Sequence, residues 1–283
     1  MANEPVEPGV PPASTARTGE EWTSDVWAAG DYERTAIQYL PMAARLVDDV
    51  EVDADDTVLD IGTGTGNVAI TAARQGATVS GIDICGDLLE TARSRAATLG
   101  HPDVAFDDGD AAQLPYPDDS FDVTVSALGH MYADPPSAAA EELIRVTRPG
   151  GRIGFTAWGP MSLYARMAGV ALQHVPPSAL PEYTEPPFLW GDPESVRDRL
   201  EPYVATLEID TSELAYPTVS PAAWWKETKR KSGMFHQLIS SLDPESLEDL
   251  EGDMLPVIGS GFDSKENAVQ LSYLQTVATL PKA

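Results

Sequence analysis

The chain has 283 residues, of which 42% are hydrophobic, and this is enough to bury a sizeable core. Its net charge of -27, from 45 acidic and 18 basic residues, argues against nucleic acid and anionic membranes as partners, because both are polyanions. No apolar run approaches the roughly 20 residues that cross a bilayer, and no secretory signal opens the chain, so a cytoplasmic protein without membrane insertion is expected. Cys85 is the only cysteine, which excludes internal disulfides and cysteine-cluster metal sites, and no metal is expected.

The first part of the chain predicts a tail, a helical segment and then an alternation of strands and helices. Residues 1–20 are rich in Pro, Gly, Ala, Ser and Thr and are expected to be disordered. An apolar stripe that includes Trp27 and Leu46 predicts one or two helices over residues 22–50. Strands are predicted at 57–61, 77–82, 104–106, 122–126 and 152–158, with helices at 66–74, 86–99 and 137–147 between them. This alternation is typical of an α/β fold with a doubly wound, mostly parallel sheet.

The alternation of strands and helices ends after residue 158. Helices are predicted at 161–175 and 193–200, two or three more within 221–250, and strands at 204–216 and 268–279. The helical pieces between the late strands are expected to form a cap over the carboxyl edge of the sheet, where such folds bind ligands. We therefore predict a single domain over residues 21–283. Its cofactor-binding core spans 21–158, and its substrate cap and last strands span 159–283.

A strand, a glycine turn and a helix start follow one another in the run VLDIGTGTG, from Val58 to Gly66. Glycines can take positive φ and let a ligand press against bare backbone, and the N–H groups at the helix start are unpaired. The G-x-G-x-G spacing, followed by Asn67, departs from the dinucleotide fingerprint G-x-G-x-x-G. Asp60 points at the turn, where a carboxylate would repel a pyrophosphate but suits the amino group of a methionine-type moiety. These features favour S-adenosylmethionine (SAM) over NAD as the cofactor.

Two further carboxylates follow the next strands. Asp83 ends the second predicted strand, where a carboxylate accepts hydrogen bonds from both ribose hydroxyls, although Asp is also a good helix N-cap. Ile84 is expected to pack against the adenine face or, alternatively, in the ordinary core. Asp110 lies just past the third strand, where it can accept from the adenine amino group while the Ala111 N–H reaches a ring nitrogen. A simple turn aspartate is the alternative for Asp110.

Four sequence runs in the same part of the chain point to a known family. The runs VLDIGTGTGNVAI, GID, GDAAQLPYPDDSFD and RVTRPGG, within residues 57–158, resemble the class I SAM-dependent methyltransferases. The resemblance is strongest to their small-molecule branch, which includes ubiquinone and menaquinone C-methyltransferases, and the segment WAAGDY resembles the helix that closes over SAM in relatives. It implies a seven-stranded Rossmann-like sheet with an antiparallel last strand. Together with the turn residues, the candidate SAM-binding residues are Tyr32, Asp60, Gly62, Thr63, Gly64, Asp83, Ile84, Asp110, Ala111 and Ser126.

The chemistry of the methyl acceptor is less well specified by the sequence. His130 follows the fourth predicted strand, near the expected position of the methyl group, and is the candidate catalytic residue. A general base is needed only if the nucleophile carries a proton that must leave, so a structural role for His130 is the alternative. Aromatic residues such as Trp158, Tyr164 and Trp224 either line a substrate pocket or form the core of the cap. The sequence predicts SAM-dependent methylation of a small molecule. A quinone-type C-methyltransferase, an NAD(P)-binding oxidoreductase and a SAM-binding protein without activity are the alternatives.

The charge composition also indicates salt adaptation. Only five residues of the chain are lysine, namely Lys226, Lys229, Lys231, Lys265 and Lys282. An acidic, lysine-poor surface on a foldable chain repels itself at low salt, whereas in molar salt the Debye length falls to about 3 Å and the repulsion is screened. The sequence therefore predicts a halophilic source.

Overall fold

The computed structural model describes residues 24, 26–29, 31–176 and 183–283. The predicted tail over residues 1–20 lies outside the described residues. Among the described residues, no helix is both long enough and apolar enough to cross a membrane.

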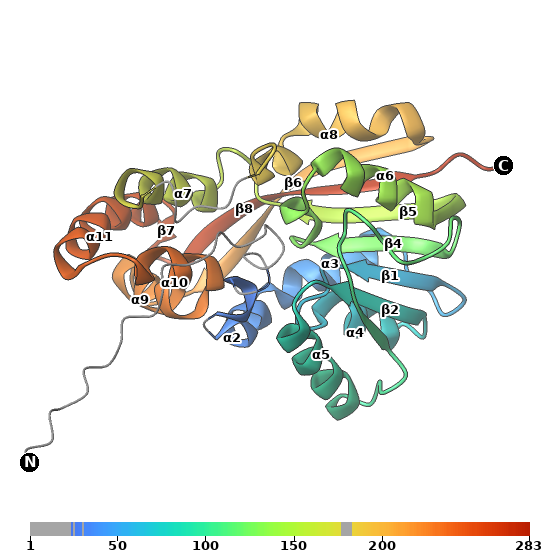
Figure 1. Cartoon of the computed structure of the whole chain (residues 1–283), viewed down its shortest axis with the longest axis horizontal. Coiled ribbons are helices and arrows are strands. Elements are labelled where there is room, and N and C mark those ends of the chain that lie inside the picture. Colours follow the sequence, from blue (N-terminus) through green and yellow to red (C-terminus); the bar gives the residue numbers. More distant parts are fainter. Residues whose placement is uncertain (1–23, 25, 30, 177–182) are drawn as a thin grey trace, which may run out of the picture.

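A central sheet has the strand order β3-β2-β1-β4-β5-β8-β6 (Figure 1). Its strands are β1 (Thr57–Ile61), β2 (Thr78–Asp83), β3 (Ala105–Asp108), β4 (Phe121–Ala127), β5 (Thr147–Ala157), β6 (Thr206–Pro217) and β8 (Ala268–Thr279), and a two-residue strand β7 (Phe262–Asp263) pairs with β8. Strands β1 to β5 pair in parallel, and β8 runs antiparallel to both β5 and β6. The predicted mostly parallel sheet with an antiparallel last strand is confirmed, with β7 as a short addition.

The main departure from the predicted strands is the start of β5. The sequence predicts a turn at Arg148-Pro-Gly-Gly and a strand from 152, whereas β5 begins at Thr147. Phe121 pairs with Thr147, and the next pairing is Val123 with Arg152, so the extra residues form an irregular, bulged part of the strand. The pairing of β4 with β5 resumes at Arg152, so the run Arg148-Pro-Gly-Gly lies inside the strand as a bulge.

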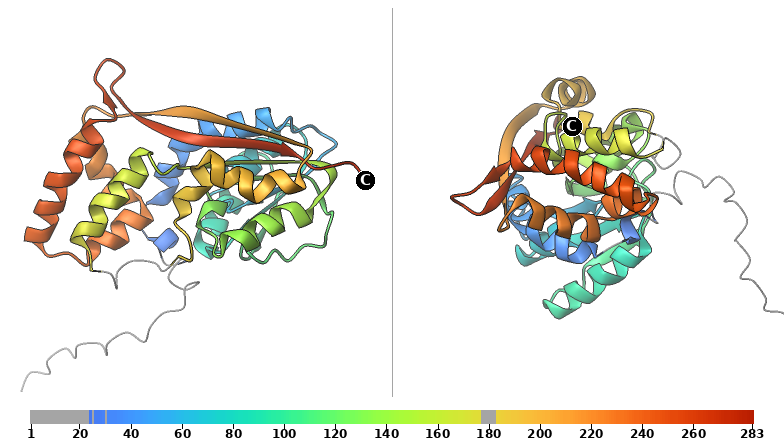
Figure 2. Two further views of the ribbon diagram at one scale, coloured as in Figure 1. Left: turned by 90° about the horizontal axis from the view of Figure 1, so that it is seen from above. Right: turned by 90° about the vertical axis from the view of Figure 1, so that its left-hand side faces the viewer.

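Helices cover both faces of the sheet, as a doubly wound fold requires (Figures 1 and 2). The helices α3 (Leu40–Asp49), α4 (Asn67–Arg74) and α5 (Gly86–Thr98) pack on one face through a core cluster that includes Leu46, Val68 and Leu89. On the other face lie α6 (Pro136–Val146) and α8 (Pro193–Leu200), which bury Leu143 and Val196 in a second cluster. Strand β1 is almost fully buried between the faces, which explains its continuous apolar sequence.

The cap is built from helices that gather beyond one end of the sheet. These are α7 (Leu163–His174), which precedes β6, and α9 (Pro221–Lys231), α10 (Gly233–Ser240) and α11 (Pro244–Gly259), which lie between β6 and β8. Since α7 follows β5 closely, the cap lies at the carboxyl edge of the sheet, and β6 and β8 reach out to it (Figure 2, left). Buried residues of the sheet and the cap, such as Phe155 and Trp224, belong to one core cluster. The predicted cap among the late strands is confirmed.

Short segments join the core to the cap. Helix α2 (Tyr32–Ala36) continues through the turn η1 (Ile37–Tyr39) into α3 and contacts α9 of the cap. Two further 3-10 turns, η2 (His130–Tyr132) and η4 (Pro187–Gly191), lie near the carboxyl ends of β4 and β5, and η5 (Glu201–Tyr203) follows α8. The carboxyl edge of the sheet is thus enclosed by segments from distant parts of the chain.

Candidate functional site

The glycine turn between β1 and α4 has the geometry that the sequence predicts. Gly62, Gly64 and Gly66 have φ values of +63°, +54° and +82°, in the region that favours glycine. A Cβ atom on Gly62 would lie 2.6 Å from the Cα of Gly129, so the loop after β4 requires a glycine there. A Cβ atom on Gly64 would meet only the ring of Tyr32, at 3.6 Å. Gly64 is therefore the glycine whose surroundings leave room for a ligand.

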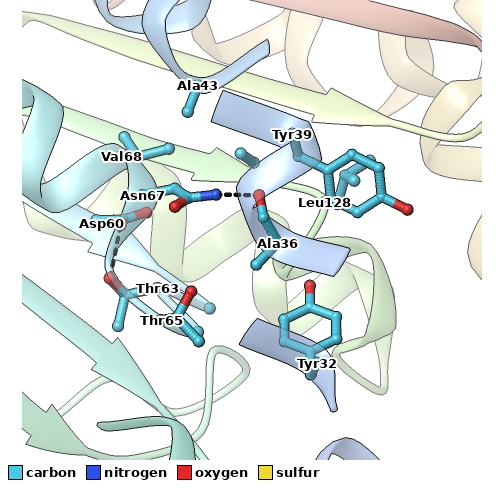
Figure 3. Close-up of a pocket in the computed structure, with 13 residues that line it drawn as sticks. Tyr32, Ala36, Tyr39, Ala43, Asp60, Thr63, Thr65, Asn67, Val68 and Leu128 are labelled. Carbon is cyan, nitrogen blue, oxygen red and sulfur yellow. Dashed lines mark hydrogen bonds between the residues drawn. The ribbon is translucent and has the colours of Figure 1, made fainter. Parts of the chain in front are cut away.

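A pocket opens beside this turn, between the carboxyl end of β1 and the α2–η1 segment (Figure 3). It is lined by Tyr32, Ala36, Tyr39, Ala43, Asp60, Gly62, Thr63, Gly64, Thr65, Asn67, Val68, Ala127 and Leu128. Five predicted cofactor residues, from Tyr32 to Gly64, are among these lining residues. Within the part of the chain that the structure describes, no group of three or more His, Cys, Asp or Glu side chains forms a metal-binding cluster.

Asp60 is a buried carboxyl group in which only one of the two oxygens is hydrogen-bonded within the described residues. Its Oδ2 accepts hydrogen bonds from the Thr63 hydroxyl at 2.6 Å and from the Ala69 N–H at 3.0 Å. Its Oδ1 is buried and has no hydrogen-bond partner among the described residues. Burial raises the pKa of Asp60 to about 7, despite the opposing effect of these two hydrogen bonds. An unpartnered buried carboxylate oxygen is costly, so this atom fits a positively charged amino group that enters the pocket.

Asp83 ties the end of β2 to the glycine turn. Its Oδ2 accepts a hydrogen bond from the Gly64 N–H at 2.7 Å, and its Oδ1 accepts one from the Cys85 N–H at 2.9 Å. Burial raises the pKa of Asp83, opposed by its bonds to the Cys85 and Gly64 backbones. Helix α5 begins after Cys85, so Asp83 is not its N-cap residue. Each carboxylate oxygen retains a lone pair for a ligand hydroxyl.

The α2–η1 segment is held over the pocket by hydrogen bonds that the sequence reading missed. The Asn67 side chain donates to the Ala36 carbonyl at 2.6 Å (Figure 3). Arg95 of α5 in turn donates to the Thr65 hydroxyl at 2.7 Å and to the Asn67 side-chain oxygen at 3.0 Å. At the level of sequence, Asn67 only distinguishes the glycine spacing from the dinucleotide fingerprint. A polar side chain at the first residue of α4, directly after the glycine turn, could have indicated a hydrogen bond to a neighbouring segment. The bond to Ala36 ties the last residue of α2 to the start of α4, and Tyr32 is the first residue of that same helix.

The remaining predicted cofactor residues do not line the pocket. Asp110 is half-buried, and its Oδ1 accepts a hydrogen bond from the Ala112 N–H at 2.8 Å, as the alternative of a turn aspartate predicts. Ala111 packs against the larger core cluster, and Ile84 is half-buried beyond Asp83. The Ser126 hydroxyl is buried and joins two backbone groups, donating to the Ile61 carbonyl at 2.5 Å and accepting from the His130 N–H at 3.0 Å. Asp83 does not line the pocket either, so the cofactor contacts of Asp83 and of these four residues stay predictions.

His130 lies under the carboxyl edge of the sheet in an aromatic environment. Its ring is fully buried, with centroid distances of 4.5 Å to Phe155 and 4.4 Å to Trp190. Neither ring nitrogen has a hydrogen-bond partner among the described residues. Burial lowers the pKa of His130 to about 3, and Arg199 lowers it further, so the imidazole is neutral near pH 7. His130 is not among the residues that line the pocket, and its catalytic role stays a prediction.

Comparisons with known proteins agree with this geometry. A family profile described as a methyltransferase domain matches residues 58–151. Two uncharacterised proteins of Mycobacterium tuberculosis are 36% and 32% identical to the chain; the alignments cover 59% and 69% of this chain and 60% and 68% of those relatives. The chain thus spans about three fifths of the length of the relatives that are 36% identical. A ubiquinone/menaquinone biosynthesis C-methyltransferase of Bdellovibrio bacteriovorus is 38% identical over 39% of this chain and 47% of that enzyme.

Solved structures share the fold of the chain. The YcgJ protein from Bacillus subtilis superposes with a TM-score of 0.56 at 19% identity, covering 86% of this chain and 100% of that chain. Phosphoethanolamine N-methyltransferase 2 of Haemonchus contortus, in complex with S-adenosyl-L-methionine, superposes with a TM-score of 0.54 at 15% identity, covering 86% of this chain and 53% of that chain. The sheet, the glycine turn and these relatives together show that the chain belongs to the class I SAM-dependent methyltransferases.

Proposed function

We propose that the protein transfers a methyl group from SAM to a small-molecule acceptor. The observation that carries this proposal is the unpartnered Oδ1 of Asp60, buried beside the open backbone of Gly64 in the pocket. A dinucleotide would place a pyrophosphate near this carboxylate, whereas SAM carries an amino group that satisfies it. The carboxylate of Asp60 and the open backbone at Gly64 therefore fit SAM better than a dinucleotide.

The chain's own residues bind and orient the donor. When bound, SAM supplies an electrophilic methyl group on a sulfonium that is already a good leaving group. Asp60 holds the amino group, Asp83 accepts from the ribose hydroxyls, and the backbone at Gly64 lets the donor lie close. Tyr32, held over the turn by the α2–η1 segment, excludes water from the donor. Catalysis then depends mainly on positioning an acceptor in line with the methyl group.

A quinone-type C-methyltransferase is the second candidate, and one observation favours it. The enzyme from Bdellovibrio bacteriovorus is 38% identical, but over only 112 residues, fewer than half of this chain. The cofactor part of a methyltransferase does not determine its acceptor, because function depends on the site and not on the fold. The small-molecule acceptor is therefore proposed as a class, and a quinol is one member of it.

Direct binding and turnover test the proposal. In isothermal titration calorimetry, SAM and S-adenosylhomocysteine should bind with one site per chain, while NAD should not bind. Incubation with methyl-labelled SAM and pools of small molecules should then yield labelled products. Binding of NAD in preference to SAM would reverse the cofactor assignment. Tight SAM binding without any labelled product across wide acceptor pools would instead support a SAM-binding protein without activity.

We also propose that the protein comes from a salt-adapted organism, on the basis of its charge of -27 and its five lysines. Screening of self-repulsion by salt stabilises the compact state. The melting temperature should therefore rise steeply between low and molar KCl. A melting temperature that stays flat over this range would contradict salt adaptation without touching the methyltransferase proposal.

A further inference from the structure

Two tyrosine hydroxyls join the cofactor pocket to the cap. Tyr39 of η1 lines the pocket, and its hydroxyl lies 2.7 Å from that of Tyr164 on α7. In Figure 3 the Tyr39 hydroxyl points away from Asp60 and from the turn residues Thr63 and Thr65. The hydroxyl pair therefore lies on the cap side of the pocket, where an acceptor would meet the transferred methyl group.

Other tyrosines surround this pair. After burial, Tyr32 of α2 and Tyr216 of β6 are among the groups that raise the pKa values of Tyr39 and Tyr164. The pKa of Tyr132 in η2 is raised by burial and then by Tyr183, Tyr32 and Tyr164. Tyr32 and Tyr132 are deep enough for burial to raise the pKa of each phenol, yet both side chains keep accessible surface. We call the group of Tyr32, Tyr39, Tyr132, Tyr164 and Tyr216 the tyrosine chamber, because two of its members line the cofactor pocket and a third, Tyr164, belongs to helix α7 of the cap.

The rings at the centre of the chamber are fixed by aromatic neighbours. Tyr164 packs on Trp158 with a centroid distance of 4.9 Å, stacks on Phe235 at 6.3 Å and contacts Trp224 at 6.0 Å. Tyr39 packs edge to face on Trp158 at 5.9 Å. Since these faces are occupied by neighbours, the groups of Tyr39 and Tyr164 that remain for a ligand are their hydroxyls. A cation that needs a free ring face finds little of one here.

The groups that shift the pKa values of the two central phenols are other tyrosines, which are uncharged at neutral pH. The largest influences on the pKa of Tyr39 and Tyr164 are burial and other tyrosines, and both pKa values are raised. The carboxylates that act on the group reach only its edges, namely Asp83 at Tyr32 and Glu227 at Tyr216. Glu227 is itself paired with Lys231. The two central phenols therefore stay protonated, and among the described residues the side-chain hydrogen bond of each hydroxyl is to the other phenol and not to a charged group.

We propose that the tyrosine chamber is the methyl-acceptor site and that it takes a neutral, planar acceptor whose oxygen hydrogen-bonds to the Tyr39–Tyr164 hydroxyl pair. One hydroxyl of the pair donates to the other, which leaves a single O–H to donate outward and oxygen lone pairs to accept. A hydroxyl or carbonyl on an aromatic ring matches this set. A carboxylate or an ammonium group would lose its hydration without a partner of opposite charge. The proposal rests on the proposed methyl transfer and adds the acceptor class and its contacts.

Calorimetry with matched probes tests the chamber directly. The full chain, saturated with S-adenosylhomocysteine, is titrated with 2-naphthol, 2-naphthoate and (2-naphthyl)trimethylammonium, which share one ring system and differ in charge. The naphthol should bind at least about tenfold more tightly than either charged probe. Tyr164→Phe and Tyr39→Phe should each weaken naphthol binding by about 3–10-fold, the loss of one hydrogen bond. Tyr203→Phe is the control, because Tyr203 is 55% exposed and remote from the chamber by its place in η5.

The affinity for S-adenosylhomocysteine separates the two proposals. Tyr164 does not line the cofactor pocket, so Tyr164→Phe should leave that affinity unchanged. Stronger binding of the naphthoate or the ammonium probe, no binding of naphthol, or naphthol binding in both Phe variants that is as tight as in the wild type would each overturn the chamber as a site for neutral acceptors. With S-adenosylhomocysteine still bound in those cases, the methyltransferase proposal would stand. Failure of the wild-type chain to bind S-adenosylhomocysteine would overturn both.

Discussion

The cofactor pocket and the tyrosine chamber lie side by side but are built in opposite ways. In the pocket, most of the polar contacts described above come from one stretch of chain, in which Asp60 binds Thr63, Gly64 binds Asp83 and Thr65 binds Arg95. In the chamber, the phenols come from α2, η1, η2, α7 and β6, and the central pair of Tyr39 and Tyr164 is 125 residues apart. The pocket contains the buried carboxylate of Asp60, whereas the central pair of the chamber packs against aromatic rings.

The two constructions suit two different ligands. The pocket is proposed to bind the charged donor SAM, and the chamber is proposed to bind the methyl acceptor. Charges and backbone N–H groups fixed by short-range hydrogen bonds hold one molecule in one pose. Aromatic side chains on separate elements can be exchanged singly without disturbing the fold. The predictions below test whether the two regions act as independently as their construction indicates.

The largest effect is expected from Gly64→Val. Gly64 has a φ of +54°, which a β-branched residue resists, and the added side chain would fill the space between the turn and Tyr32. SAM affinity should fall by at least about a hundredfold, which corresponds to about 2.7 kcal/mol. Titration calorimetry on the folded variant measures this loss. Near-normal SAM binding would mean that the glycine turn is merely a tight connection.

Asp83→Ala should have the next largest effect. The substitution removes the carboxylate that orders Gly64 and the charge-assisted hydrogen bonds proposed for the ribose hydroxyls. SAM affinity should fall by at least about tenfold. Asp55→Ala is a matched control, since Asp55 is exposed in the loop before β1 and does not line the pocket. If both variants bind SAM like the wild type, Asp83 has no role in the site.

A pH dependence of donor binding is expected from Asp60. Burial raises its pKa from 3.8 to about 7, so the folded apo protein holds a proton that the unfolded chain releases near pH 4. The Asp60 contribution to apo stability is therefore present at low pH and is lost as the pH rises through about 7. Because the ionised carboxylate binds the amino group, SAM affinity should rise up to about tenfold between pH 6 and 8. Calorimetry in buffers of different ionisation enthalpy would also detect the released proton.

Asp60→Asn provides the control for this pH dependence. It keeps the shape of the side chain and can still accept from Thr63 and Ala69, but it carries no titrating group. Its SAM affinity should be lower and flat over the same pH range. An unchanged rise of affinity with pH in the Asn variant would assign the titration to another group.

The contrast between the regions also explains how far the sequence could be read. The strand, turn and helix pattern around Gly62 to Asp83 depends on neighbours in the chain, so its fold and the turn residues Gly62, Thr63 and Gly64 that line the pocket were predictable. The need for glycine at position 62 was not predictable, because the atom that excludes a side chain there belongs to Gly129 on another loop. The bond between Asn67 and Ala36 and the Tyr39–Tyr164 pair join residues that no spacing rule connects. Predictions of contacts across the chain, such as that of Ser126 with the cofactor, therefore remain the least determined.

The smallest effect on turnover is expected from His130→Leu, which tests whether the residue between the two regions takes part in chemistry. The imidazole is fully buried between Phe155 and Trp190, and burial lowers its pKa to about 3. A leucine fills much of the same volume without unpaired nitrogens, so the fold should survive the change. Turnover on an acceptor found by product screening should change by less than about threefold, whereas loss of a general base costs roughly 10²–10⁴-fold.

A second readout of the same variant follows from linkage. The folded-state pKa of His130, about 3, lies below its ordinary value of 6.5, so the unfolded chain takes up a proton that the folded chain does not. The wild type therefore loses stability as the pH falls from about 6.5 towards 3, and this loss should be smaller in His130→Leu. Urea unfolding of both proteins at pH 7 and pH 5 measures the difference. A hundredfold drop in turnover of the folded Leu variant, with unchanged SAM affinity, would instead show that His130 reaches the acceptor and acts as its base.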